Sequence, residues 1–311
     1  MSGDILELKS VNAGYSDKKG VLKNVSLSIK HNEFFGLVGE SGCGKSTLSR
    51  AILGLLPFEG SIRVNGVSLS AHNRLSLSRE VQAVFQDPLA ALNPRHTIGF
   101  SMEEPLKIHK IGTKEERRIL VNNMIEKVGL DKSLLSRYPS ELSGGQRQRI
   151  CIGSSLMLRP KLVVADEATS ALDVSVGSQI LNLFQQIHSE MEFSLLFISH
   201  NINVVYYLCD RIAVMFKGRI VEQGTADDIC NRPLHPYTRL LMSAVPDLDD
   251  VKPKTPLVKF KKAEDVPEGA CGFYRRCPYS TAVCAKESAL VNAAKEGDDE
   301  HLVRCHHIYQ F

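Results

Sequence analysis

The sequence lacks the features of membrane-embedded, secreted and nucleic-acid-binding proteins. It contains no run of about 18 apolar residues, so we expect no segment to span a membrane. Its first residues, MSGDILELKS, lack the basic start and apolar core of a signal peptide, so we expect a cytosolic location. The net charge is only +3 over 311 residues, whereas nucleic-acid binding usually calls for a concentrated basic face. We therefore expect no nucleic-acid partner.

The order of apolar patterns predicts an α/β fold. Residues 4–11 and 25–30 alternate as strands do, and FFGLVG at 34–39 is an apolar run that ends in glycine. STLSRAILGLL, at 46–56, follows with helical spacing. Further apolar runs, KLVVAD and SLLFISH, are typical of buried parallel strands. A strand, a loop and a helix in succession indicate a parallel sheet covered by helices.

The loop between the third strand and the helix predicts a phosphate site. GESGCGKST, Gly39–Thr47, matches the pattern G-x-x-x-x-G-K-[ST]. Glycines let backbone N–H groups turn toward phosphate oxygens, and Lys45 brings a cation to the terminal phosphates. The positive end of the following helix points at the same anion. The residues that we expect to contact ATP in this loop are Gly39, Ser41, Gly42, Gly44, Lys45, Ser46 and Thr47.

A second motif supplies carboxylates to the same site. LVVADE, at 162–167, places Asp166 at the end of a buried strand, where a magnesium ion would sit with Ser46. Glu167 follows directly and is positioned to polarise a water molecule for attack on the γ-phosphate. ATP and Mg²⁺ are therefore the expected ligands, and hydrolysis is the expected reaction.

LSGGQRQR, at 142–149, narrows the assignment from phosphate-loop ATPases in general. It resembles the signature motif of ATP-binding cassette (ABC) proteins, and it precedes the Asp166 strand as in that family. The resemblance implies a nucleotide-binding domain with a phosphate-loop core, an antiparallel β subdomain and a helical subdomain. It also implies roles for more residues: Tyr15 stacks on adenine, Gln86 senses Mg²⁺ and the attacking water, Ser170 and Asp173 lie in a loop at the dimer interface, and His200 contacts the γ-phosphate.

The resemblance further implies an ATP site that is shared by two chains. The signature residues Ser143, Gly144, Gly145 and Gln146 would act on the ATP held by a partner ATPase chain. One departure from the family pattern is Ala168, where proline usually follows the glutamate. Both carboxylates of the motif are intact, so we expect this change to have little effect on hydrolysis.

Three other segments resemble the ATPase subunits of oligopeptide, dipeptide and nickel importers. They are FQDPLAALNPRHTIG (85–99), RPLHPYTRLLMSAVP (232–246) and VPEGACGFYRRCP (266–278). The resemblance implies an ATPase, bound peripherally at the cytoplasmic face of the cell membrane, that powers peptide import. Its implied partners are a second ATPase subunit, two permease subunits and, indirectly, a solute-binding protein. Alternatives are import of nickel or a metal chelate, and a soluble ABC ATPase without a permease.

The composition changes after about residue 230 and predicts a modular C-terminal part. We expect a nucleotide-binding domain over 1–235, with its helical subdomain at about 88–160, and a cysteine segment over 268–311. Six of the 13 prolines fall between 233 and 267, which predicts an extended linker over 236–267.

Four of the eight cysteines lie in this last segment, with the spacing C-x5-C-x6-C-x20-C. Cytosolic thiols stay reduced, so clustered cysteines suggest a metal before a disulfide. Four thiolates suit either an iron–sulfur cluster or zinc, but the close C-x2–4-C pairs typical of zinc are absent. The importer resemblance implies a [4Fe–4S] cluster, with Zn²⁺ or an unmetallated segment as alternatives. The expected ligands are Cys271, Cys277, Cys284 and Cys305.

Overall fold

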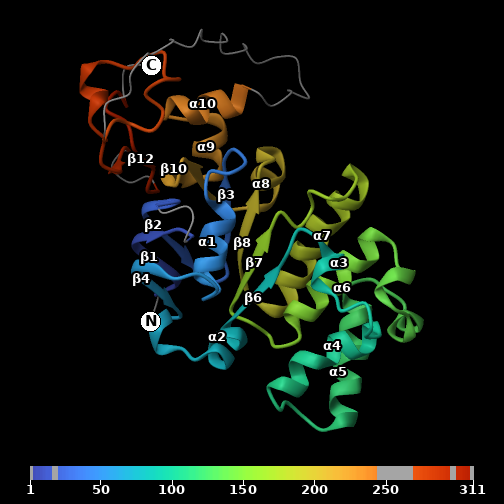
Figure 1. The fold of residues 1–311 in the computed structure, drawn as a ribbon. Helices are drawn as coiled ribbons and strands as arrows, with labels where there is room; N and C mark the ends of the chain where they lie inside the picture. Colours follow the sequence, from blue (N-terminus) through green and yellow to red (C-terminus); the bar gives the residue numbers. More distant parts are fainter. Residues whose placement is uncertain (1–2, 16–19, 244–268, 295–298, 309–311) are drawn as a thin grey trace.

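A mixed eight-stranded sheet forms the centre of the molecule (Figure 1). The computed structural model describes residues 3–15, 20–243, 269–294 and 299–308. In spatial order the strands are β11 (Val291–Asn292), β12 (Leu302–Val303), β10 (Arg219–Thr225), β9 (Arg211–Phe216), β3 (Phe34–Val38), β8 (Ser194–Ser199), β7 (Leu162–Asp166) and β6 (Val81–Val84). Five neighbouring strands of this sheet, β9, β3, β8, β7 and β6, run parallel, whereas β10, β12 and β11 join its other edge through antiparallel pairing.

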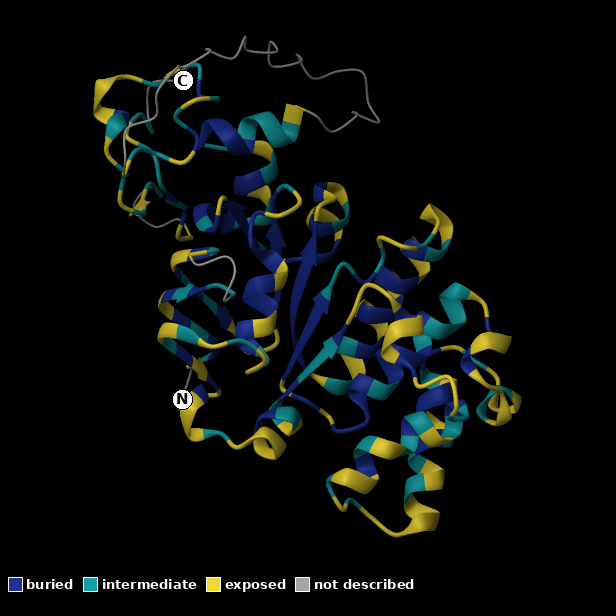
Figure 2. Ribbon diagram, viewed as in Figure 1, coloured by how far each residue is buried: buried dark blue, intermediate teal, exposed yellow. Residues whose placement is uncertain are grey.

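The central strands are parallel and buried because their sequences are almost wholly apolar. Every residue of β3 and of β8 is buried, as Figure 2 shows for the middle of the sheet. Such runs, without polar alternation, require cover on both faces. The predicted strands at 34–39, 161–166 and 194–200 are therefore confirmed as the core of an α/β fold.

A separate antiparallel sheet carries the N-terminus. Its four strands, in spatial order, are β2 (Leu22–Lys30), β1 (Asp4–Ala13), β4 (Phe58–Val64) and β5 (Val67–Ser68). Apolar side chains from β1 and β2 pack with those of α1 (Lys45–Ile52) and of the central sheet in one hydrophobic cluster. The helix after the phosphate loop is thus held between the two sheets.

Helices lie between β6 and β7, in the range for which the helical subdomain is predicted. They are α3 (Pro88–Ala91), α4 (Ile98–Ile108), α5 (Lys114–Lys127) and α6 (Gly144–Leu156), and α7 (Val174–Met191) packs with them in a second hydrophobic cluster. The remaining helices are α2 (Arg74–Glu80), α8 (Ile202–Leu208), α9 (Ala226–Asn231) and α10 (Pro236–Ser243), and short 3-10 turns lie at 69–71, 132–136, 139–141 and 282–285. In the part of the chain that the structure describes, no helix combines the length and apolar character needed to cross a membrane.

The first part of the predicted linker is a helix. Residues 236–243 form α10, whose first residue is Pro236. A proline at the start of a helix loses no hydrogen bond, because the N–H group there would have no intrahelical partner. Proline content was therefore a misleading signal for these residues. The rest of the predicted linker, 244–267, lies outside the described residues.

The C-terminal segment joins the central sheet. Strand β12 pairs with β10 through Glu222↔Val303 and Gln223↔Leu302, and β11 extends the same edge. Glu222 is fully buried, and its carboxylate oxygen lies 2.8 Å from the His301 Nε2 atom. The backbone N–H group of His235 also donates to this carboxylate. A buried carboxylate needs such partners, so Glu222 ties the segment to the domain.

Candidate ATP site and cysteine cavity

The phosphate loop connects β3 to α1 and depends on two of its glycines. Gly39 has φ +156°, and a Cβ atom added there would lie 2.2 Å from the Met215 carbonyl oxygen. Gly44 has φ +116° and precedes the first helical residue. A larger residue at Gly39 would collide with the backbone of β9, and both glycines adopt backbone conformations that side chains disfavour.

Lys45 points into this loop. Its buried ammonium donates to the carbonyl oxygens of Gly39, at 2.8 Å, and Glu40, at 3.2 Å. The start of α1 contains no acidic side chain that would oppose an anion. An ammonium and a helix N-terminus at one loop match the charge of a triphosphate.

Asp166, at the end of β7, faces the first turns of α1. Its carboxylate accepts hydrogen bonds from the Ser46 hydroxyl, at 3.3 Å, and the Ser49 hydroxyl, at 3.0 Å. The structure thus brings Ser46 and Asp166 together, as their predicted role with magnesium requires. Sequence reasoning missed Ser49. Its position three residues after Ser46, on the same helix face, was the available signal.

Glu167 and His200 also meet. The His200 Nδ1 atom lies 3.4 Å from a Glu167 carboxylate oxygen. Glu167 has φ +51°, and its N–H group donates to the Ile198 carbonyl oxygen of β8. This hydrogen bond and the unusual backbone conformation fix the carboxylate at the sheet edge. The geometry suits a general base beside a histidine, although both roles remain predictions.

Gln86 and Tyr15 are two further residues of the predicted ATP site. Gln86 is exposed just beyond β6, which pairs with β7 through Val84↔Ala165, so it follows the same carboxyl edge as Asp166. The Tyr15 hydroxyl accepts a hydrogen bond of 2.9 Å from Arg50 at the end of α1. The Arg50 guanidinium lies 5.8 Å from the centre of the Tyr15 ring.

The signature residues lie away from this phosphate loop. Ser143 caps α6 and forms reciprocal hydrogen bonds with Gln146. In Figure 1, α6 is separated from α1. Across the described ranges, no hydrogen bond or ion pair joins 143–146 to the chain's own phosphate loop. A helix N-terminus that lies apart from the chain's own phosphate loop is the geometry that the predicted ATP site shared with a partner would need.

Contacts with Val176 explain both the glycine within the signature and the capping residue of α7. A Cβ atom added to Gly145 would lie 2.7 Å from a Val176 methyl group at the start of α7. Asp173 caps α7 by accepting from the Val176 N–H group at 2.9 Å. Ser170 and Asp173 are both exposed and therefore available to a partner, and Ala168 is buried.

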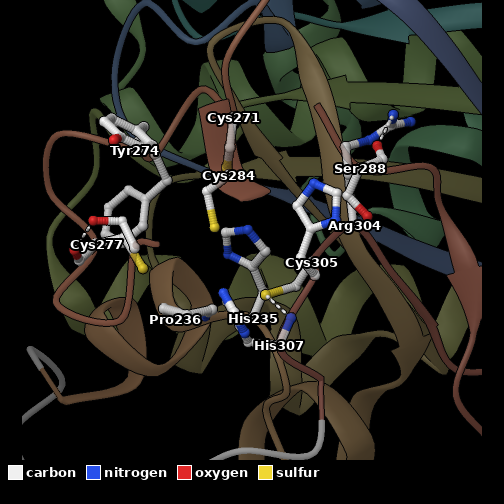
Figure 3. A pocket seen from close by; sticks show the side chains of 13 residues that line it. His235, Pro236, Cys271, Tyr274, Cys277, Cys284, Ser288, Arg304, Cys305 and His307 are labelled. Carbon is white, nitrogen blue, oxygen red and sulfur yellow. Dashed lines mark hydrogen bonds between the residues drawn. The ribbon is translucent and has the colours of Figure 1, made fainter. Parts of the chain in front are cut away.

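The four C-terminal cysteines line one small cavity of about 20 Å³ (Figure 3). Burial raises the pKa of the thiols of Cys271 and Cys305, and raises the pKa of Cys277 to about 11. The thiols are therefore held neutral in the protein alone. Among the described residues, however, no group of three or more histidine, cysteine, aspartate or glutamate side chains is arranged to hold a metal ion.

His235 lines the same cavity. Its Nδ1 atom accepts a hydrogen bond of 3.0 Å from the Tyr237 N–H group. Burial lowers the pKa of His235 to about 4, so the ring is neutral at physiological pH. With Nδ1 as the acceptor, the single ring proton resides on Nε2. His235 therefore supplies a neutral imidazole beside the four cysteines, and His306 and His307 line the same cavity.

Comparisons with known proteins agree with these features. Residues 22–170 match the ABC transporter family, and 221–284 match the oligopeptide/dipeptide transporter C-terminal region. The di/tripeptide transport ATP-binding protein DppF of Pseudomonas aeruginosa is 44% identical over 93% of this chain and 90% of its own. The oligopeptide transport ATP-binding protein OppF of Escherichia coli is 44% identical over 90% of this chain and 86% of its own.

The fold agrees as well. The solved structure of CbiO1 from Clostridium perfringens, part of an ABC transporter complex, superposes with a TM-score of 0.68 at 27% identity. The alignment covers 76% of this chain and 95% of that one. The predicted ABC-type α/β fold is therefore confirmed.

The arrangement of Glu167 predicts how hydrolysis fails when its charge is removed. Glu167→Gln should lower kcat for ATP at least about a hundredfold, because an amide cannot accept the water proton. Nucleotide affinity should remain within about twofold, because Lys45 and the loop are untouched. Steady-state phosphate release and nucleotide titration measure the two quantities.

A matched control is Glu192→Gln. Glu192 is exposed and precedes the first residue of β8, whereas His200 follows the last residue of that strand. The control substitution should leave both kcat and affinity unchanged. Near-normal turnover by Glu167→Gln would show that another group acts as the base.

Proposed function

The chain belongs to the ATP-binding subunits of ABC transporters of the oligopeptide/dipeptide type, and we propose on this premise that it hydrolyses ATP to drive import of di- or oligopeptides. The observation that carries the substrate class is the match over 221–284 to the oligopeptide/dipeptide transporter C-terminal region. That region includes β10, α10 and three of the cavity cysteines.

In the proposed reaction, the phosphate loop and Lys45 bind the triphosphate, while Ser46 and Asp166 hold Mg²⁺, with Gln86 nearby. Glu167 takes a proton from a water molecule whose oxygen attacks the γ-phosphorus. The bond between that phosphorus and the β–γ bridging oxygen breaks, and the Lys45 ammonium balances the charge that develops on ADP. A magnesium ion held by Ser46 and Asp166 would supply further positive charge there. His200 orients Glu167, and its exposed ring is accessible to the γ-phosphate.

The proposed assembly contains a second ATPase subunit and two permease subunits, with a solute-binding protein acting on the permease. Ser143, Gly144 and Gly145 would direct their donors at the partner's ATP, and Ser170 and Asp173 would line the interface. The helical subdomain would contact the permease. In support, it exposes the large apolar side chains of Leu89 and Phe100. This places the chain peripherally at the cytoplasmic face of the membrane.

Peptide uptake tests the proposed substrate. In cells that lack this chain, uptake of labelled di- and tripeptides should fall to background. Wild-type protein should restore it and Glu167→Gln should not, because the permease moves only with hydrolysis. Restored uptake of nickel but not of peptides would assign the alternative metal substrate. Normal peptide uptake without the chain would contradict the proposal.

We also propose that Cys271, Cys277, Cys284 and Cys305 bind a [4Fe–4S] cluster that holds the C-terminal segment together. The support is chemical, since all four cysteines line one cavity, and binding would require their sulfur atoms to move closer together than they lie here. A cluster would supply positive iron that favours thiolates, against the burial that raises the pKa of Cys271, Cys277 and Cys305. In its described residues, 269–294 and 299–308, the segment forms two short strands and one 3-10 turn, so it contributes little core of its own, and cross-linking its thiols would compensate.

Metal analysis after anaerobic purification tests this assignment. Wild-type protein should carry iron and acid-labile sulfide in equal amounts, and Cys277→Ser should lose both and unfold at a lower temperature. The control Cys230→Ser alters a cysteine that does not line the cavity and should retain the cluster. Zinc in a one-to-one ratio to protein would replace the assignment of iron. Wild-type protein that contained no metal and was no more stable than Cys277→Ser would contradict any metal site. Normal stability of Cys277→Ser with loss of a redox-dependent activity would exclude the structural role.

A further inference from the structure

We propose that Arg276 and Tyr237 are positioning residues for ATP binding, acting on the phosphate loop through Glu40. Both lie outside the phosphate-loop core, Tyr237 in α10 and Arg276 in the cysteine segment. Glu40 is the second residue of the loop and stands at a variable position of its pattern, so no sequence motif indicates a role for it. The proposal rests on ATP binding at this loop and is independent of the transported substrate.

Glu40 is contacted at three points. Its carbonyl oxygen accepts from the Lys45 ammonium at 3.2 Å. Its N–H group donates to the Tyr237 hydroxyl at 3.0 Å. Its carboxylate oxygens lie 2.8 and 3.0 Å from the Arg276 Nη1 atom. One residue therefore joins the phosphate-binding lysine to both C-terminal elements.

The residues that contact Glu40 are themselves firmly placed. Tyr237 is fully buried, and its ring packs against Phe216 and Phe273, with centroid distances of 4.5 and 5.6 Å. The Arg276 guanidinium lies 5.8 Å from the Phe216 ring centre and 5.5 Å from that of Phe273. Aromatic contacts of this kind restrict an arginine to few rotamers. The guanidinium is therefore preorganised toward Glu40.

The turn that presents Arg276 lies between two of the cavity cysteines. Within it, the Tyr274 N–H group donates to the Cys271 carbonyl oxygen and the Cys277 N–H group donates to the Phe273 carbonyl oxygen, each at 2.9 Å. These backbone hydrogen bonds hold the turn between Cys271 and Cys277 in one conformation. The same hydrogen bonds therefore fix the position of Arg276.

The charge of Glu40 gives this contact a consequence for nucleotide binding. A carboxylate in the phosphate loop repels the phosphates of ATP, and the repulsion acts over several ångströms. Arg276 neutralises that charge. Together with Tyr237, it also fixes the backbone of Glu40, whose carbonyl oxygen accepts from the Lys45 ammonium. Loss of Arg276 would leave the carboxylate unopposed beside the triphosphate. Both side chains are partly exposed, with 39% and 41% of their surface accessible, so the expected effect is moderate.

The test is equilibrium binding of ATP, ADP and AMP to the purified full-length chain at low and high salt. Arg276→Ala should raise the Kd for ATP about fivefold, in keeping with the loss of a partly exposed ion pair. The effect should be smaller for AMP, which carries less charge, and should shrink as salt rises. Arg275→Ala removes the same charge from the adjacent, exposed residue and should change the Kd less than about twofold.

Rescue separates positioning from folding. Adding Glu40→Gln to Arg276→Ala should restore the Kd to near the wild-type value, because no unopposed carboxylate remains. Damage to the fold of the segment would not be repaired in this way. Arg276→Lys keeps the charge and should give a Kd between those of the wild type and Arg276→Ala. Tyr237→Phe removes the hydroxyl acceptor and should raise the Kd for ATP, ADP and AMP by the same factor.

An unchanged Kd in Arg276→Ala, or a loss that Glu40→Gln does not repair, would overturn the proposal. Failure of the wild-type chain to bind any nucleotide would instead overturn the proposed ATPase function. The two failures are therefore distinguishable.

Discussion

The structure depends on one electrostatic requirement. The carboxyl edge of its parallel sheet must offer positive potential to the negative charge of a triphosphate. Lys45 and the N-terminus of α1 supply the positive potential, and Asp166 stands opposite with Ser46 and Ser49. Strands β3, β7 and β8 must be parallel and adjacent for these groups to meet. Their almost wholly apolar sequences follow from that demand, because a sheet with functional loops at one edge is covered on both faces.

The same requirement explains why the phosphate loop and the signature residues lie in different surroundings. The phosphate loop passes close to the backbone of β9, since a Cβ atom added to Gly39 would lie only 2.2 Å from the Met215 carbonyl oxygen. The signature instead lies at the start of α6, where Ser143 is exposed, and among the described residues no hydrogen bond or ion pair joins 143–146 to the phosphate loop. A site divided between chains is complete only when the chains close, and closure is what can couple hydrolysis to movement.

Much of this account could be predicted from local sequence, and the reason is physical. Phosphate binding by backbone N–H groups needs particular residues at fixed spacing, so Gly39, Lys45 and Ser46 were identifiable, as was the strand ending in Asp166. Contacts between distant segments leave no such pattern. The bond from Glu40 to Arg276 spans 236 residues, and the pairing of β12 with β10 depends on two residues at each strand. The helix at 236–243 was missed because proline signals a break or a helix start alike.

The most direct test of the central claim is a structure of the assembled transporter with Glu167→Gln and Mg²⁺–ATP bound. The account predicts that the γ-phosphate at Lys45 is contacted by the signature of the second ATPase subunit, while Ser143 of this chain contacts the nucleotide bound by that subunit. If Ser143 lay far from every nucleotide in the closed complex, or if ATP bound away from Lys45, the account of a shared ATP site would be wrong.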